Sequence, residues 1–163
     1  MPTATLTDLE RALRSLESQL RLSRVEIAVV IDPVAIREVA RVTGTWRGVS
    51  LMGLDLRDKV VTHNHPRPGV PFPSFDDVNA GAANNALQVR VAGWWMNKPW
   101  LTTITRDAKF KAWPAVLPAF DAFHVELVKS YIARYGVNPA WKKLLPMLGG
   151  SFPEWLTYWG GYV

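Results

Sequence analysis

The chain has 163 residues, of which 48% are hydrophobic and 20% are charged. These proportions exclude a disordered chain and a membrane-embedded one, and they predict a soluble globular domain. No residue is cysteine, so disulfide bonds, thiolate metal ligands and a catalytic thiol are excluded, and any metal ion must be bound through nitrogen and oxygen. The net charge of +5 is dispersed without a basic run, which disfavours a nucleic-acid partner.

The first predicted element is a helix that begins after Thr7. Thr7 and Glu10 fit a capping box, in which each side chain accepts a hydrogen bond from the backbone amide of the other residue. Leucines then recur at spacings of four, three and four, and form one apolar helical face: Leu9, Leu13, Leu16 and Leu20. Residues 27–31 are apolar at both parities, which predicts a central strand buried on both sides.

Short strands and a second helix are predicted next. Residues 32–44 fit either a short helix opened by Asp32 and Pro33 or a strand that ends at Gly44. The strand is favoured because these residues alternate along it: Ile36, Glu38, Ala40 and Val42. Further strands are expected around residues 49–51, 60–62, 87–91 and 100–105, and a helix over residues 74–85 with Ser74 as its N-cap.

The last fifty residues have a helical pattern. A helix is predicted from residue 113 to a stop at Gly136, with His124 in or near the core, and a shorter one over residues 140–148. A glycine-rich tail over residues 149–163 carries four aromatic side chains: Trp155, Tyr158, Trp159 and Tyr162. Such an aromatic cluster is typical of a contact with a protein partner or a second copy of the chain. The expected fold class is α/β, a mixed β-sheet flanked by helices, with residues 1–112 as the main domain and residues 113–163 as a helical C-terminal extension packed on it.

The residues that indicate chemistry lie between the predicted strand at 60–62 and the following helix. His63 and His65 are two residues apart at the strand end, so both imidazoles point to the same face and can bind one ion. Asp77, in the first turn of the helix, adds a carboxylate; its spacing favours it over the neighbouring Asp76. Three protein ligands leave the fourth position of a tetrahedral zinc site for water, whose pKa falls to about 7. Taken alone, Ser74 and Asp77 would be an ordinary helix start, but the histidine pair favours a metal site.

The same residues resemble a known motif. His63-x-His65-Pro66, then seven residues, Ser74, two residues and Asp77 is similar to the motif of the JAMM/MPN+ metalloproteases, and the His-Asn-His-Pro wording is most similar to bacterial RadC-like and to prophage or toxin-associated members. The resemblance covers about residues 24–106. It implies a cytidine-deaminase-like fold and a zinc-dependent hydrolase of peptide or isopeptide bonds. It also implies that His63, His65 and Asp77 bind Zn²⁺ and that Ser74 stabilises the oxyanion.

The family further implies an upstream glutamate as general base. Glu26, which opens the predicted strand at residues 27–31, is the choice, although the Gly-Leu-Leu-x-Gly wording that usually follows this glutamate is absent. Glu38, on the apolar parity of its predicted strand, is the alternative. A buried glutamate in such a place requires a metal ion or a hydrogen bond to compensate its burial.

Two functions from different classes are therefore expected. The first is a zinc metallopeptidase or isopeptidase that acts on a peptide or protein substrate. The second is a binding module of JAMM-like fold, with little or no catalysis, in a phage, toxin or DNA-repair assembly. No targeting signal or bilayer-spanning stretch is predicted, so the expected location is cytoplasmic, although a phage-encoded or secreted effector protein would have the same sequence features.

Overall fold

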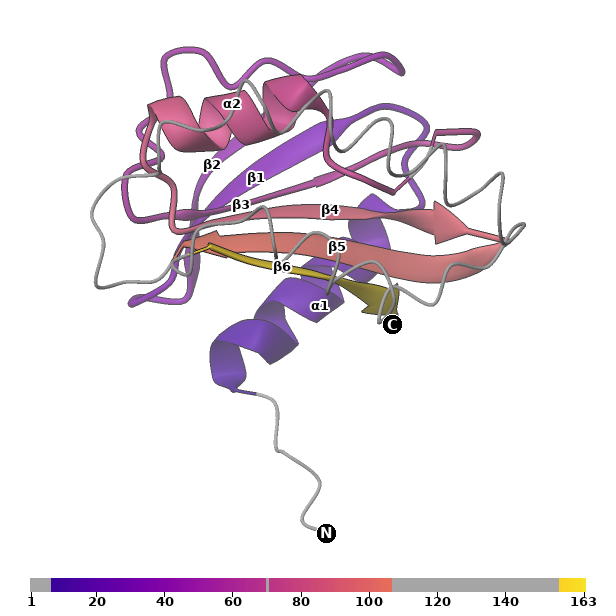
Figure 1. Ribbon diagram of the computed structural model, residues 1–163, viewed down its shortest axis with the longest axis horizontal. Coiled ribbons are helices and arrows are strands. Elements are labelled where there is room, and N and C mark those ends of the chain that lie inside the picture. The colour runs from indigo at the N-terminus through magenta and orange to yellow at the C-terminus, as the bar shows by residue number, and fades with distance from the viewer. Residues whose placement is uncertain (1–6, 70, 107–155) are drawn as a thin grey trace, which may run out of the picture.

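The architecture was analysed in a computed structural model that describes residues 7–69, 71–106 and 156–163 (Figure 1). Its elements in chain order are α1 (Asp8–Leu20), β1 (Ile27–Asp32), β2 (Arg37–Thr43), β3 (Val60–Asn64), α2 (Phe75–Ala83), β4 (Gln88–Trp95), β5 (Lys98–Arg106) and β6 (Leu156–Tyr162). The strands form one mixed sheet in the order β2-β1-β3-β4-β5-β6. The predicted α/β class with a mixed sheet is confirmed.

Among the described strands, one neighbouring pair is parallel. β3 and β4 run in the same direction and are connected through α2, whereas the other four neighbouring pairs are antiparallel. A parallel pair needs a crossover connection, and here the crossover helix lies on one face of the sheet while α1 lies on the other (Figure 1). The sheet is therefore the middle layer of three.

The alternation of side chains along β3 separates the two faces. Val61 points toward α2 and belongs to a cluster of buried apolar side chains that includes Val78 of α2. Val60 belongs to a second buried cluster on the other face, with Leu13 and Leu20 of α1. Strand β1 contributes to both clusters, which explains why residues 27–31 are apolar at both parities.

Helix α1 begins as predicted, but only half of the predicted capping box forms. The Thr7 hydroxyl accepts a hydrogen bond from the Glu10 amide at 3.2 Å. The predicted second bond of the box, from the Thr7 amide to the Glu10 carboxylate, does not form. That carboxylate instead accepts hydrogen bonds from the guanidinium of Arg90 at 2.9 and 3.0 Å and from that of Arg14 at 2.9 Å. A charged partner forms a stronger hydrogen bond than a neutral amide does, so the tertiary contact replaces the local one.

A buried ionic cluster joins α1 to the sheet. Arg90 of β4 donates to both carboxylate oxygens of Glu17, at 2.5 and 3.0 Å, and both residues are at most 1% exposed. The hydroxyl of Thr62 donates to the same carboxylate at 2.9 Å. Burial alone would lower the pKa of Arg90, but the hydrogen bonds and charges of Glu17 and Glu10 raise it above its usual value, so the guanidinium stays charged.

Three sequence-based expectations about secondary structure can be compared with the structure. The strand favoured within residues 32–44 is confirmed as β2, and the helix capped by Ser74 is confirmed as α2. The strand predicted around residues 49–51 is wrong: this segment is a loop, and its apolar side chains Leu51 and Leu54 pack against the α2-side cluster. Burial under a loop requires apolar residues just as a strand does, so composition alone could not separate the two.

The end of the chain also differs from the expected helical extension. β6 pairs with β5 in antiparallel register, Trp100 opposite Tyr162, and so completes the sheet. The Trp100 and Tyr162 rings meet edge to face with centroids 4.8 Å apart. Part of the glycine-rich tail expected over residues 149–163 is therefore a strand of the main sheet, and the helices predicted over 113–136 and 140–148 lie outside the described residues, as does His124. Within the described residues, no helix is both long and apolar enough to cross a membrane.

Candidate metal centre

The pairing of β1 with β3 brings Glu26, His63 and His65 to one face of the sheet. Ala28 of β1 pairs with His63 of β3, and the two strands are antiparallel. Glu26 comes directly before β1 and shares the parity of Ala28, while His65 comes directly after β3 and shares the parity of His63. Side chains two residues apart on a strand point to the same face, so Glu26 and His65 meet beyond the strand ends, on the side covered by α2.

The ligating atoms converge within hydrogen-bond distance. The Nε2 atoms of His63 and His65 are 3.1 Å apart. Asp77, at the start of α2, places Oδ1 3.1 Å from Nε2 of His63 and Oδ2 3.4 Å from Nε2 of His65. Glu26 completes the group, because it and the two histidines each offer a ligating atom within 4.8 Å of the others.

These separations fit a tetrahedral zinc ion. Ligand atoms about 2.0–2.2 Å from such an ion lie about 3.3–3.6 Å from one another, which is close to the spacing of the two imidazoles and the Asp77 carboxylate. Two nitrogens and one oxygen are also ordinary zinc ligands in a chain without cysteine. Nε2 is the nitrogen of His63 that faces the other candidate ligands. Its Nδ1 is buried without a hydrogen-bond partner among the described residues.

The electrostatics of the two carboxyl groups differ. Burial would raise the pKa of Asp77, but the charges and hydrogen bonds of His63 and His65 lower it well below its usual value. Burial raises the pKa of Glu26, and the nearby Asp77 charge adds to this rise, while the two imidazoles and a hydrogen bond from the backbone of Val49 partly oppose it. Asp77 is thus held as the anion that a cation site needs, and Glu26 binds a proton more readily than an exposed glutamate.

Ser74 and Asp77 form the N-terminal cap of α2, and the Asp77 carboxylate also contacts the two histidines. The Asp77 amide donates to the Ser74 hydroxyl at 3.2 Å, and the Ser74 amide donates to Oδ2 of Asp77 at 2.6 Å, which is a complete capping box. The cap fixes the Asp77 carboxylate so that Oδ1 remains directed at His63. Asp76, its exposed neighbour, takes no part in these contacts. The ordinary helix-start interpretation and the metal-site interpretation are therefore compatible.

Asn64, between the two histidines, fixes the backbone on both sides of Glu26. Its Oδ1 accepts from the Ile27 amide at 2.8 Å, and its Nδ2 donates to the Val25 carbonyl at 2.9 Å. Asn64 is fully buried. Since these bonds hold the residues before and after Glu26, they determine where the Glu26 carboxyl lies relative to the histidines. Sequence reasoning missed this residue, although its position inside the His-Asn-His triplet was a signal.

The loop that follows His65 is anchored on β4 and β5. The His65 amide donates to the Ala92 carbonyl at 3.0 Å, and the hydroxyl of Thr102 donates to the Pro71 carbonyl at 2.7 Å. Gly93 permits the close approach, because a Cβ added there would lie 2.8 Å from the Cβ of Pro71. These contacts attach the loop between the two histidines and α2 to the sheet.

A cleft of about 510 Å³ opens beside the candidate metal centre. It lies between the loop at residues 49–53 and α2, and His63, Asp76 and Asp77 line it. The expected alternative base, Glu38, is not near these residues: it lies exposed on β2 and binds the guanidinium of Arg41 at 2.7 and 2.8 Å. The structure thus brings together Glu26, His63, His65 and Asp77, with Ser74 at the cap, and leaves Glu38 apart.

Comparisons of the chain with protein-family models, with curated proteins and with solved structures give no match. The functional assignment therefore depends on the geometry of this site and on the motif.

Proposed function

We propose that this protein is a zinc-dependent hydrolase of peptide or isopeptide bonds, as the JAMM/MPN+ resemblance implies. The observation that carries the proposal is the convergence of the His63 and His65 Nε2 atoms and the Asp77 carboxylate at 3.1–3.4 Å, with Glu26 beside them. This arrangement has three ligands of the kind found at catalytic zinc and a separate carboxyl group that need not be a ligand.

Each residue has a role that its surroundings support. Zinc bound here would supply Lewis acidity, which makes a water acidic near neutral pH and polarises a carbonyl. Glu26 accepts the proton of the attacking water and delivers it to the leaving amine; its raised pKa suits a group that must both take and release a proton. The Ser74 hydroxyl, which accepts from the Asp77 amide, still has its own proton to donate to the substrate carbonyl oxygen.

The metal content tests the ligand set. Purified protein is expected to contain about one zinc per chain by elemental analysis. Asp77→Asn removes a charged ligand and is expected to lower the zinc content strongly, whereas the matched variant Asp76→Asn changes an exposed neighbour and retains it. Equal zinc loss in both variants, or no zinc in the wild type after reconstitution, would contradict the proposed site.

Hydrolysis tests the base. Glu26→Gln is expected to retain zinc but to lose about 100-fold or more in rate, because a general base typically contributes that much. Glu38→Gln is the matched control and is expected to keep full activity, since Glu38 binds Arg41 on an edge strand. The substrates are a protease-digested protein mixture and a set of lysine-linked isopeptides, with products followed by mass spectrometry. Unchanged hydrolysis in Glu26→Gln would exclude Glu26 as the base.

One observation favours the second candidate, a binding module of JAMM-like fold. The side chains of the three ligands are only 2%, 13% and 15% exposed, which limits the approach of a substrate to the metal position. Stoichiometric zinc together with no turnover of any peptide or isopeptide in the panel would favour this function over the hydrolase.

A further inference from the structure

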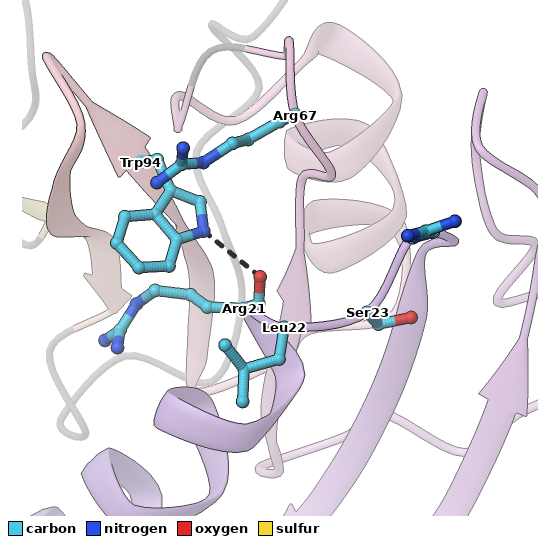
Figure 2. A pocket seen from close by; sticks show the side chains of 6 residues that line it. Arg21, Leu22, Ser23, Arg67 and Trp94 are labelled. Carbon is cyan, nitrogen blue, oxygen red and sulfur yellow. Dashed lines mark hydrogen bonds between the residues drawn. The ribbon is translucent and has the colours of Figure 1, made fainter.

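A second pocket, of about 480 Å³, lies where α1 ends near β4 (Figure 2). Its described lining is Arg21, Leu22, Ser23, Arg24, Arg67 and Trp94. Three of these six residues are arginines, and no acidic side chain belongs to the described lining. We call it the arginine pocket. Such a concentration of guanidinium groups around one hollow attracts an anion.

Trp94 organises two of the arginines. The guanidinium carbon of Arg67 lies 4.1 Å from the centroid of the Trp94 ring, a cation–π contact, and the indole N–H donates to the Arg21 carbonyl at 3.1 Å. Figure 2 shows the Arg67 guanidinium against one side of the indole and the Arg21 chain passing on the other. Stacking restricts the plane of the Arg67 guanidinium, so less conformational entropy is lost when its N–H groups bind a ligand.

Arg21 adds an unsatisfied donor. Its side chain lines the pocket, the residue is only 9% exposed, and its Nε is buried without a hydrogen-bond partner among the described residues. The Glu17 carboxylate, whose charge acts on Arg21, already accepts two hydrogen bonds from Arg90 and one from Thr62. A buried guanidinium N–H without an acceptor is unfavourable, and the positive charge of Arg21 adds to that of Arg24 and Arg67 around the pocket.

The arginine pocket adjoins the metal centre along the chain. Arg24 comes two residues before Glu26, and Arg67 comes two residues after His65. Two extended residues span about 6.6–6.8 Å, so the backbone of each of these arginines lies within about that distance of the backbone of a candidate site residue.

We propose that the arginine pocket binds a carboxylate of the peptide substrate, so that the enzyme prefers an acidic residue close to the bond it cleaves. This rests on the proposed function for the identity of the ligand as a peptide. A planar guanidinium held against an aromatic ring binds a carboxylate through two parallel N–H bonds, which gives orientation as well as affinity. Leu22, 75% exposed, offers an apolar contact for the methylene groups of a glutamate.

Binding without turnover tests this proposal separately from hydrolysis. A fluorescein-labelled tetraglutamate peptide and its tetraglutamine counterpart are titrated with the zinc-loaded full chain carrying Glu26→Gln, and fluorescence polarisation is measured. We expect the tetraglutamate peptide to bind at least about fivefold more tightly, and Arg67→Gln and Arg24→Gln each to remove most of that preference. Arg47→Gln is the matched control, because Arg47 is an exposed arginine that also stacks on a tryptophan, 4.5 Å from the Trp46 ring; it is expected to bind as the parent does.

The outcomes separate the two proposals. Equal binding of both peptides, tetraglutamate binding unchanged by Arg67→Gln and Arg24→Gln, or an equal loss in Arg47→Gln would overturn the arginine pocket as the site. Displacement of the peptide by inorganic phosphate at lower concentrations than by glutarate would overturn the carboxylate as its ligand. Arginine-dependent binding in a chain that cleaves no peptide would leave the pocket standing and remove the hydrolase; hydrolysis without any acidic preference would do the reverse.

Discussion

At the scale of single residues, Asn64 of β3 binds the backbone on both sides of Glu26. Asn64→Asp keeps the size of the side chain and the acceptor for the Ile27 amide, but it loses the donor to the Val25 carbonyl. We expect a loss of about 1–3 kcal/mol in the free energy of unfolding, because a buried carboxylate would face the Val25 carbonyl, which would keep only its hydrogen bond from the Ser23 hydroxyl at 2.8 Å. We also expect kcat to fall about tenfold while zinc content and KM change little, because a displaced base affects the chemical step.

Urea unfolding, elemental analysis and steady-state kinetics of Asn64→Asp give the three readouts. If the variant loses stability but keeps its kcat, Asn64 contributes only to stability, which would contradict its role in positioning Glu26.

Asp32 illustrates a residue whose charge contributes to stability away from the site. Its Oδ1 accepts from the amides of Ala35 and Val34 at 3.1 and 3.0 Å, and its Oδ2 binds the ammonium of Lys59 at 3.0 Å. The Ala35 amide first, then Lys59 and Val34, lower the pKa of Asp32 to about 2. A depressed pKa in the folded state means that the ionised form stabilises the fold above about pH 4, and that this contribution is lost as the pH falls toward 2.

Asp32→Asn is therefore expected to be less stable than the wild type at pH 7, with a difference that shrinks as the pH is lowered from about 4 to 2. Urea unfolding of both proteins across that range measures it. A difference that stays constant down to pH 2 would show that the charge of Asp32 makes no contribution.

At the scale of elements, α1 is attached to the sheet by charge as well as by leucines. Arg90→Met would leave the Glu17 carboxylate, which is 0% exposed, without its bidentate partner. Breaking such a pair costs about 3–5 kcal/mol, whereas replacing both partners with apolar residues is often neutral. We therefore expect Arg90→Met to be strongly destabilised, and the double variant Arg90→Met with Glu17→Met to recover most of the loss.

Arg14→Met provides the comparison for that experiment. Arg14 pairs with Glu10 at 2.9 Å on the partly exposed side of α1, so its loss is expected to change the free energy of unfolding by less than about 1 kcal/mol. Urea unfolding of the four proteins tests the set. A double variant no more stable than Arg90→Met would show that the ionic cluster contributes net stability and not only compensation for burial.

Local patterns in the sequence predicted helices and strands well, but they could not predict contacts between residues far apart in the chain. The Ser74 cap and the alternation in β2 depend on neighbours a few residues away, so the pattern alone contains the answer. The Glu10 carboxylate binds Arg90, eighty residues along the chain, in place of the capping-box amide, and no local sequence pattern predicts this contact. Likewise, Gly160 and Gly161 lower the strand propensity of residues 156–162, so the sequence did not predict β6. This strand forms because its backbone pairs with the edge of β5.

At the scale of the whole molecule, the two faces of the sheet carry different groups. The face under α1 carries the buried ionic cluster, and the face under α2 carries the candidate metal ligands and the cleft. The spacing of His63, His65 and Asp77 was enough to predict that these side chains meet, because the end of one strand and the start of the next helix carry all three. The place of Glu26 came only from the family resemblance, since its approach depends on the pairing of β1 with β3 and on Asn64.

The candidate metal centre joins two parts of the chain: the stretch from the end of β3 to the start of α2, which carries His63, His65 and Asp77, and Glu26, which comes directly before β1. An ion that binds only the folded chain stabilises it by about 4 kcal/mol at a free concentration 1,000 times its Kd. For a chain of this length, where each kcal/mol shifts Tm by about 2–4 °C, zinc is expected to raise Tm by about 8–16 °C.

Differential scanning calorimetry of the EDTA-treated chain, before and after zinc addition, measures this shift. The double variant His63→Gln with His65→Gln removes both nitrogen ligands and is expected to show no zinc-dependent shift, while Glu38→Gln is expected to respond as the wild type does, because Glu38 lies on the far edge strand. A full shift in the double variant would mean that zinc stabilises the fold from somewhere other than this centre. Because the shift depends on binding and not on turnover, it also separates loss of the metal site from loss of catalysis.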